Sequence, residues 1–90
     1  MSRHIIHTAK APAALGPYSQ AVRHGDLVFL SGQVAIDPAI GKLVEGGIEA
    51  QTHQVMKNLA AILYAAGSGL DKVVKTTIFL SSLDDFSGFN

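Results

Sequence analysis

The chain has 90 residues and no cysteine, and its seven Lys and Arg residues balance its seven Asp and Glu residues. This length predicts a single domain, while 48% hydrophobic and only 16% charged residues exclude an intrinsically disordered chain. The balanced charge argues against electrostatic binding to nucleic acid or to an anionic membrane, and the lack of cysteine excludes disulfides and thiolate chemistry.

The N-terminal part of the chain predicts a short strand and then a β-hairpin. Residues 3–7 form the first strand, and residues 20–24 and 27–31 form the two strands of the hairpin. Gly25 and Asp26 between them suit a type II′ turn, whose first central residue has a positive φ. The hairpin would bring residues 16–20 and 29–33 to the same end of a sheet. There a phenol, a hydroxyl, an amide and backbone N–H groups would form a small polar pocket without a strong nucleophile.

The middle of the chain predicts turns followed by one long helix. Asp37-Pro38 and Gly41 indicate a tight turn within residues 37–47. Residues 48–66 carry apolar side chains at helical spacing, and Gly67 suits the position that closes a helix. The apolar side of this helix comprises Ile48, Val55, Met56, Leu59, Ile62, Leu63 and Ala66. The other side carries Glu49, His53, Lys57 and Tyr64.

The last part of the chain predicts one more strand. Residues 73–80 are rich in β-branched and aromatic side chains, which favour a strand with one face against the helix. Ser82 or Asp84 is placed to cap a second helix. The order of these elements predicts the α+β class, with a sheet that has helices on one face.

Several segments are similar to the RidA/YjgF/UK114 family of enamine/imine deaminases. The similarity runs through residues 16–20, 29–33, 37–38, 41–47, 54–67, 73–80 and 83–90, and nearly every residue from Ala11 onward has a family counterpart. It implies a chorismate-mutase-like (RidA-type) fold with a mixed sheet. Family members continue past the position of Asn90 with a second helix, further strands, an arginine in a Pro-Ala-Arg segment and a late glutamate. Residues 1–90 would therefore form a single RidA-like domain that is incomplete at its C-terminus.

The resemblance implies a 2-iminobutanoate/2-iminopropanoate deaminase, a hydrolase that converts small 2-imino and enamine acids to 2-oxo acids and ammonia. It implies no cofactor and a homotrimer with ligand sites in clefts between subunits. Tyr18, Ser31, Gly32 and Asn90 match family positions that surround the substrate, whereas the catalytic group is unassigned. Such a site needs a cation for the carboxylate, hydrogen bonds for the imine and an activated water.

Simpler roles compete with these assignments. Tyr18 would be an aromatic plug after a Gly-Pro turn, Ser31 and Gly32 would form a turn at a strand end, and Asn90 would be a frayed terminus. Arg3 and Arg23 do not match the carboxylate-binding arginine of the family. The four histidines lack metal-ligand spacing, so no metal site is expected.

Two other functional classes remain open. Ribonuclease activity or translation inhibition is also attributed to this family, but the neutral charge and the lack of a basic-aromatic patch argue against nucleic acid as a partner. The second class is a catalytically inactive truncated or ligand-binding member, because the late arginine and glutamate have no counterpart here. On that basis residues 1–90 alone are expected to hydrolyse imines little. They are also expected to oligomerise or aggregate, because the strand at residues 73–80 would lack the neighbour that the family's later strands provide.

No apolar run approaches the roughly 18 residues of a membrane span. The first residues also lack the apolar core of a signal peptide and the composition of a transit peptide. The expected compartment is the cytoplasm, with mitochondria as the alternative.

Overall fold

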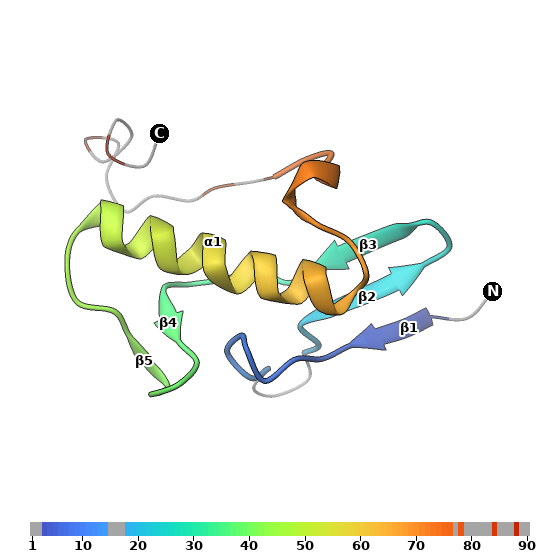
Figure 1. The fold of residues 1–90 in the computed structure, drawn as a ribbon, viewed down its shortest axis with the longest axis horizontal. Coiled ribbons are helices and arrows are strands. Elements are labelled where there is room, and N and C mark those ends of the chain that lie inside the picture. The colour runs from blue at the N-terminus through green and yellow to red at the C-terminus, as the bar shows by residue number, and fades with distance from the viewer. Residues whose placement is uncertain (1–2, 15–17, 77, 79–83, 85–87, 89–90) are drawn as a thin grey trace.

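A computed structural model describes residues 3–14, 18–76, 78, 84 and 88 of the chain (Figure 1). Its main sheet has three antiparallel strands in the order β1-β2-β3. These strands are β1 (Arg3–Ile6), β2 (Ala21–His24) and β3 (Leu27–Leu30). They match the strand and hairpin expected from the sequence, apart from single residues at the strand ends.

The turn between β2 and β3 fixes which residues face each other. Gly25 has a φ of +63°, while no described residue other than glycine has a positive φ, as a type II′ turn requires. With this two-residue turn, His24 pairs with Leu27 and Ala21 pairs with Leu30. The turn predicted from Gly25 and Asp26 is therefore confirmed.

Helix α1 (Ile48–Ala65) is the longest element of the described chain. It ends as the sequence predicts, with Gly67 at a φ of +78°. The N–H of Gly67 donates to the carbonyl of Tyr64 at 3.0 Å, and the N–H of Ser68 donates to the carbonyl of Leu63 at 2.8 Å. This pair of bonds is the Schellman motif, which satisfies carbonyls that the helix leaves without a donor.

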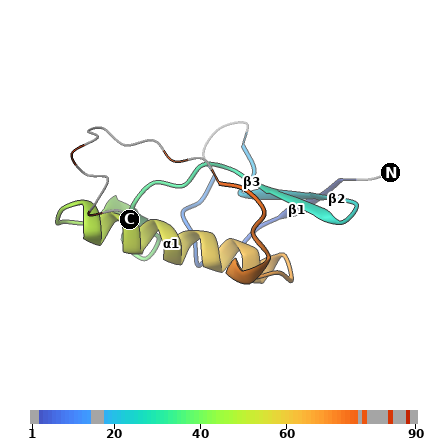
Figure 2. The same cartoon turned by 90° about the horizontal axis from the view of Figure 1, so that it is seen from above.

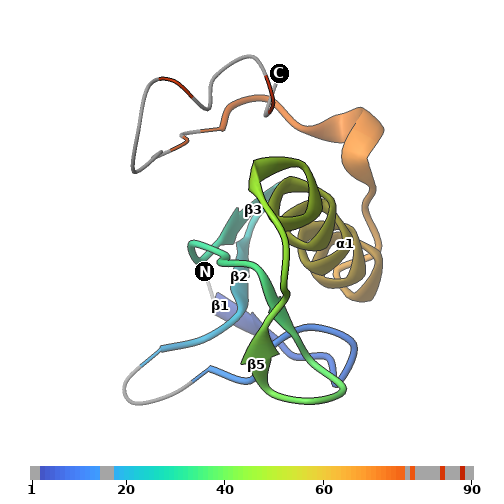
Figure 3. The same cartoon turned by 90° about the vertical axis from the view of Figure 1, so that its left-hand side faces the viewer.

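The core lies between α1 and one face of the main sheet, in two layers (Figure 2 and Figure 3). Its buried cluster consists of Ile6, Ala11, Ala21, Ile62 and Ala66, with Val28, Leu30 and Ala61 packed against it. The expected apolar side of the helix is confirmed at its C-terminal half, where Ile62, Leu63 and Ala66 are buried. Met56 was expected on the apolar side but is exposed, and the polar Asn58 was not expected there but is buried.

Arg23 joins the two layers at the C-terminal end of α1. It lies on β2 opposite His4 and Val28, and its guanidinium Nη2 donates a hydrogen bond to the carbonyl of Ala66. A cation is favourable there because the C-terminus of a helix carries a partial negative charge. Arg23 is nevertheless exposed, so its side chain contacts both the helix end and solvent.

Replacing Arg23 with methionine is expected to lower the free energy of unfolding by about 1 kcal/mol, because a partly exposed bond to a charged group is lost while the aliphatic contact remains. Urea denaturation of the full-length protein measures the change. Lys42→Met, on exposed β5, is the matched control and should leave the urea midpoint unchanged. Equal midpoints for both variants would show that the Arg23 contact contributes nothing to stability.

Two parts of the fold differ from the sequence prediction. Residues 36–43 form a small hairpin of strands β4 (Ile36–Asp37) and β5 (Lys42–Leu43), where only a turn was expected. A short 3-10 helix η1 (Leu70–Lys72) also follows α1. Conversely, residues 73–76 and 78 belong to no strand, and the side chain of Val74 is 91% exposed. A strand needs a hydrogen-bonded neighbour, and none of the described strands pairs with this segment.

The remaining expectations fall partly outside the described residues. The structure does not describe residues 77, 79 and 80 of the expected strand. It also does not describe Ser82, one of the two predicted helix caps. No helix in the described part of the chain is long and apolar enough to cross a membrane.

Candidate functional site

The two segments that the sequence singled out meet at one end of the main sheet. The backbone N–H of Ser31 donates to the carbonyl of Gln20 at 3.0 Å, and the Ser31 hydroxyl donates to the carbonyl of Ser19. These bonds continue the β2-β3 pairing by one position beyond Ala21 and Leu30. The structure thus confirms that the hairpin brings the Tyr18 segment and the Ser31 segment together.

The side chains at this junction differ in how available they are to a ligand. Tyr18 is 70% exposed, so its ring and hydroxyl are free of the core. Ser31 is half-buried, and because its hydroxyl proton is donated to Ser19, its oxygen remains as an acceptor. Gly32 is exposed, and a Cβ placed on it would meet no atom within 4 Å. The described chain therefore leaves open space beside the backbone of Gly32.

Two sequence-predicted features lie outside the described residues. Asn90 is one of them, so it is not placed relative to the junction. Gly16 and Pro17, which precede Tyr18 in the matched segment, are the other. The junction is thus defined by Tyr18, Ser31 and Gly32.

The sequence analysis missed the burial of two amides, one at the junction and one on α1. Gln20 is 3% exposed and Asn58 is 0% exposed, and both hydrogen-bond to backbone carbonyls. Asn58 could have been found from its spacing, because it lies three residues after Val55 and four before Ile62 on the apolar side of α1. Gln20 carried no comparable signal, since it stands at the start of a strand.

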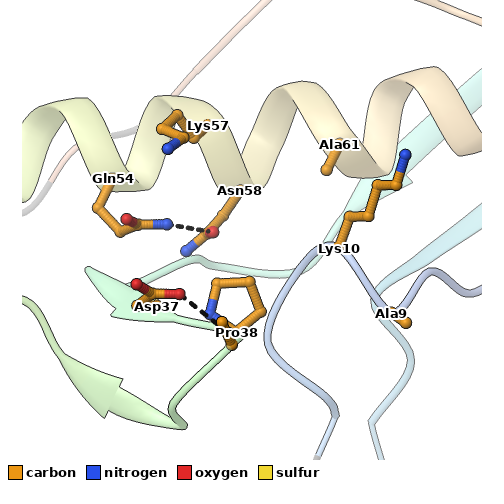
Figure 4. Close-up of a pocket in the computed structure, with 9 residues that line it drawn as sticks. Ala9, Lys10, Asp37, Pro38, Gln54, Lys57, Asn58 and Ala61 are labelled. Carbon is orange, nitrogen blue, oxygen red and sulfur yellow. Dashed lines mark hydrogen bonds between the residues drawn. The ribbon is translucent and has the colours of Figure 1, made fainter.

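A cavity of about 460 Å³ lies between α1 and the turn that follows β4 (Figure 4). Lys10 and Lys57 line it with Asp37, and Gln54 and Asn58 on α1 also border it. Tyr18, Ser31 and Gly32 are not among its lining residues. This cavity is therefore distinct from the junction that the sequence indicated.

A family model described as Endoribonuclease L-PSP matches residues 8–90. The chain belongs to this family, that of the RidA/YjgF/UK114 proteins. A RutC family protein from Pyrococcus abyssi is 47% identical over 90 residues, which cover 100% of this chain and 71% of that protein. The 2-iminobutanoate/2-iminopropanoate deaminase of Mus musculus is 50% identical over 88 residues, covering 98% of this chain and 65% of the mouse protein.

Solved structures of the RidA family confirm the fold class. A conserved Rid family protein from Yersinia pestis matches with a TM-score of 0.95 and 46% identity, over 98% of this chain and 70% of that one. RidA from a Psychrobacter species matches with a TM-score of 0.91 and 48% identity, over 96% of this chain and 69% of that one. The chain thus spans about two thirds of the mouse deaminase and about seven tenths of each of these two solved structures.

Proposed function

We propose that this protein is a 2-iminobutanoate/2-iminopropanoate deaminase, which hydrolyses 2-imino acids to 2-oxo acids and ammonia. Relatives from mouse and human that are 50% and 48% identical to this chain carry that name. The observation that carries the proposal is the hydrogen-bonded junction between the Tyr18 and Ser31 segments, which supports a shared site for Tyr18, Ser31 and Gly32.

The reaction requires little beyond positioned polar groups. Water adds to the electrophilic imine carbon, a proton moves from the water to the nitrogen, and the resulting carbinolamine releases ammonia as the carbonyl forms. In our proposal the Ser31 oxygen accepts a hydrogen bond from the imine N–H, which suits its role as an acceptor. The backbone N–H of Gly32 approaches the carboxylate, and the Tyr18 ring and hydroxyl bound the site. Asn90 would orient the substrate through its carboxamide.

These residues do not supply all that the reaction needs. The family's late arginine and late glutamate have no counterpart among the 90 residues. A charge-assisted hydrogen bond to the carboxylate contributes about 1.5–3 kcal/mol, and general acid–base catalysis contributes about 10²-fold or more. We therefore expect residues 1–90 alone to be far less active than a chain of full family length.

A coupled assay tests the proposal. Threonine dehydratase or an amino-acid oxidase generates the imine, semicarbazide traps what remains, and the full-length protein is expected to accelerate the loss of the trapped product. The same protein is incubated with RNA, because the family model is described as an endoribonuclease. RNA cleavage without accelerated imine loss would reject the deaminase in favour of the ribonuclease alternative, and the absence of both activities would favour a non-catalytic ligand-binding protein.

We further propose that the protein assembles as a homotrimer through the sheet face opposite α1. Ile5, Val22 and Phe29 pair across the three strands, and Leu27 lies on the same side as Phe29. We call these four residues the outer sheet face. Ile5, Leu27 and Phe29 are each between 57% and 64% exposed, an apolar row for which a second copy is the natural cover. Because strand residues alternate in side, Ser31 borders this face, so a neighbouring copy would come close to the junction.

The compartment is also a proposal. The lack of cysteine in these 90 residues fits a reducing compartment such as the cytoplasm. An Arabidopsis thaliana relative that is 50% identical is named as chloroplastic, so compartments differ within the family.

A further inference from the structure

The described part of the chain buries two polar side chains, and both donate hydrogen bonds to backbone carbonyls of segments that adjoin the β2-β3 hairpin. These are Gln20 on the Tyr18 side and Asn58 on α1. We propose that Gln20 and Asn58 are positioning residues for imine hydrolysis, which keep the Tyr18 segment and residues 31–36 in their relative places. This inference rests on the proposed deaminase function.

Gln20 ties the loop before the hairpin to the junction. Its Nε2 donates to the carbonyls of Thr8, Ala11 and Pro12 at 3.0, 3.3 and 2.8 Å, and its Oε1 accepts the N–H of Thr8 at 2.6 Å. Its backbone carbonyl accepts the N–H of Ser31. The side chain of Gln20 therefore fixes the loop, while its backbone carbonyl accepts the bond that forms the junction. Gln20 lies two residues after Tyr18.

Asn58 holds residues 34–36, which directly follow the Ser31 segment. Its Nδ2 donates to the carbonyls of Val34 and Ile36 at 3.1 and 2.9 Å. Its Oδ1 accepts a hydrogen bond from Nε2 of Gln54 at 2.9 Å, which orients the amide (Figure 4). Residues 31–36 are thus held by Gln20 at their start and by Asn58 at their end.

Amides are an unusual choice for a core position unless their hydrogen bonds are needed. An apolar side chain of similar volume would suit the burial, but it would leave the backbone carbonyls of both segments without donors. The carbonyls that lost these donors would have to hydrogen-bond to water instead, which would displace the two segments from their native positions. Gln20 lies at the junction and Asn58 holds residues 34–36 that follow it, so the burial of both amides points to positioning.

Carboxylate variants of the two residues give a test that depends on pH. In Asn58→Asp, one oxygen still accepts the bond from Gln54, but the other cannot donate to Val34 or Ile36 unless it is protonated. Burial against carbonyl oxygens raises the pKa of such a carboxyl above its usual range. Its charged form therefore opposes the native position at neutral pH, and its neutral form restores one donated bond at low pH. Gln20→Glu acts on the loop carbonyls in the same way.

The measurement is kcat/KM of each full-length variant divided by that of the wild type, across a range of pH. We expect the ratio to be about 10- to 100-fold below one at neutral pH and to rise as the pH falls, because small displacements of site groups cost rates of this order. Circular dichroism at each pH corrects for the folded fraction. Gln51→Glu places the same charge on the exposed side of α1 and should give a ratio that is independent of pH.

Leu63→Ala separates positioning from stability. Leu63 is buried on α1, and its side chain makes no hydrogen bond to either segment. The variant should melt at a lower temperature and yet keep wild-type kcat/KM below that temperature. A ratio near one for Asn58→Asp and Gln20→Glu at all pH values, with an active wild type, would overturn the positioning role and leave the deaminase in place.

If the wild type itself fails to hydrolyse imines, the proposed function is rejected and hydrogen exchange decides the positioning role. Gln20→Glu should then speed exchange of the Ser31 N–H at neutral pH relative to Gln51→Glu. Equal exchange rates in the two variants would overturn the inference.

Discussion

Tyr18→Phe in the full-length protein is expected to lower kcat/KM for 2-iminobutanoate by about 10²-fold, because in the proposed site the Tyr18 hydroxyl would donate a hydrogen bond to the substrate or to the attacking water. The free energy of unfolding should hardly change. The ring is 70% exposed, and within the described part of the chain the hydroxyl has no hydrogen-bond partner, so the fold loses nothing with it. The imine-trapping assay and a urea melt measure the two quantities.

Ser31→Ala should cause a comparable loss of activity with a modest loss of stability. The variant removes the acceptor oxygen proposed for the imine and also the bond to the Ser19 carbonyl. A single neutral hydrogen bond contributes about 1 kcal/mol, which predicts a small shift of the urea midpoint.

Tyr64→Phe and Ser68→Ala are matched controls for these two variants. Tyr64 is exposed on α1 and Ser68 follows the helix, so both lie away from the junction and should keep full activity. Wild-type rates for Tyr18→Phe and Ser31→Ala would reject both hydroxyls as contacts of the substrate.

Phe29→Lys is expected to break the homo-oligomer into smaller species. Phe29 lies at the end of the row that begins at Ile5 and passes through Val22, so a charge there would be buried against the partner copy. Each large apolar side chain that is fully covered contributes about 1.5–3 kcal/mol, and an unpaired buried ammonium reverses that gain. Sedimentation velocity of the full-length protein measures the mass.

Activity provides a second reading of the same variant. If ligand sites lie between copies, imine hydrolysis should fall together with the assembled fraction and return at high protein concentration. Tyr64→Lys places the same charge on the exposed side of α1 and should leave the mass unchanged. A wild type that sediments as a monomer, or an assembled Phe29→Lys, would reject the outer sheet face as the interface.

Local chemistry made the hairpin and the end of the helix predictable. Gly25 and Gly67 each occupy a position that requires a positive φ, and each lies next to a clear hydrophobic pattern. The junction could be predicted for the same reason, because a two-residue turn leaves only one way to pair the strands.

The misses depended on contacts between distant parts of the chain. The spacing of Asn58 places it on the apolar side of α1, but its partners are carbonyls 22 and 24 residues away, which no local pattern reveals. Residues 73–76 have strand propensity, but propensity forms a strand only beside a neighbour. The β4-β5 hairpin has only two residues on each side and therefore gives too short a pattern to detect.

The turn at Gly25 and Asp26 also limits how this protein can vary. The length of that turn sets which residues of β2 and β3 pair, and therefore sets the pairing of Ser31 with Gln20. One residue inserted in the turn would shift the β2-β3 register by one position. The shift would turn Leu30 away from α1 and detach Ser31 from Ser19 at the same time. Length changes at the hairpin tip, usually the most tolerant place in a sheet, are thus coupled here to both the core and the site.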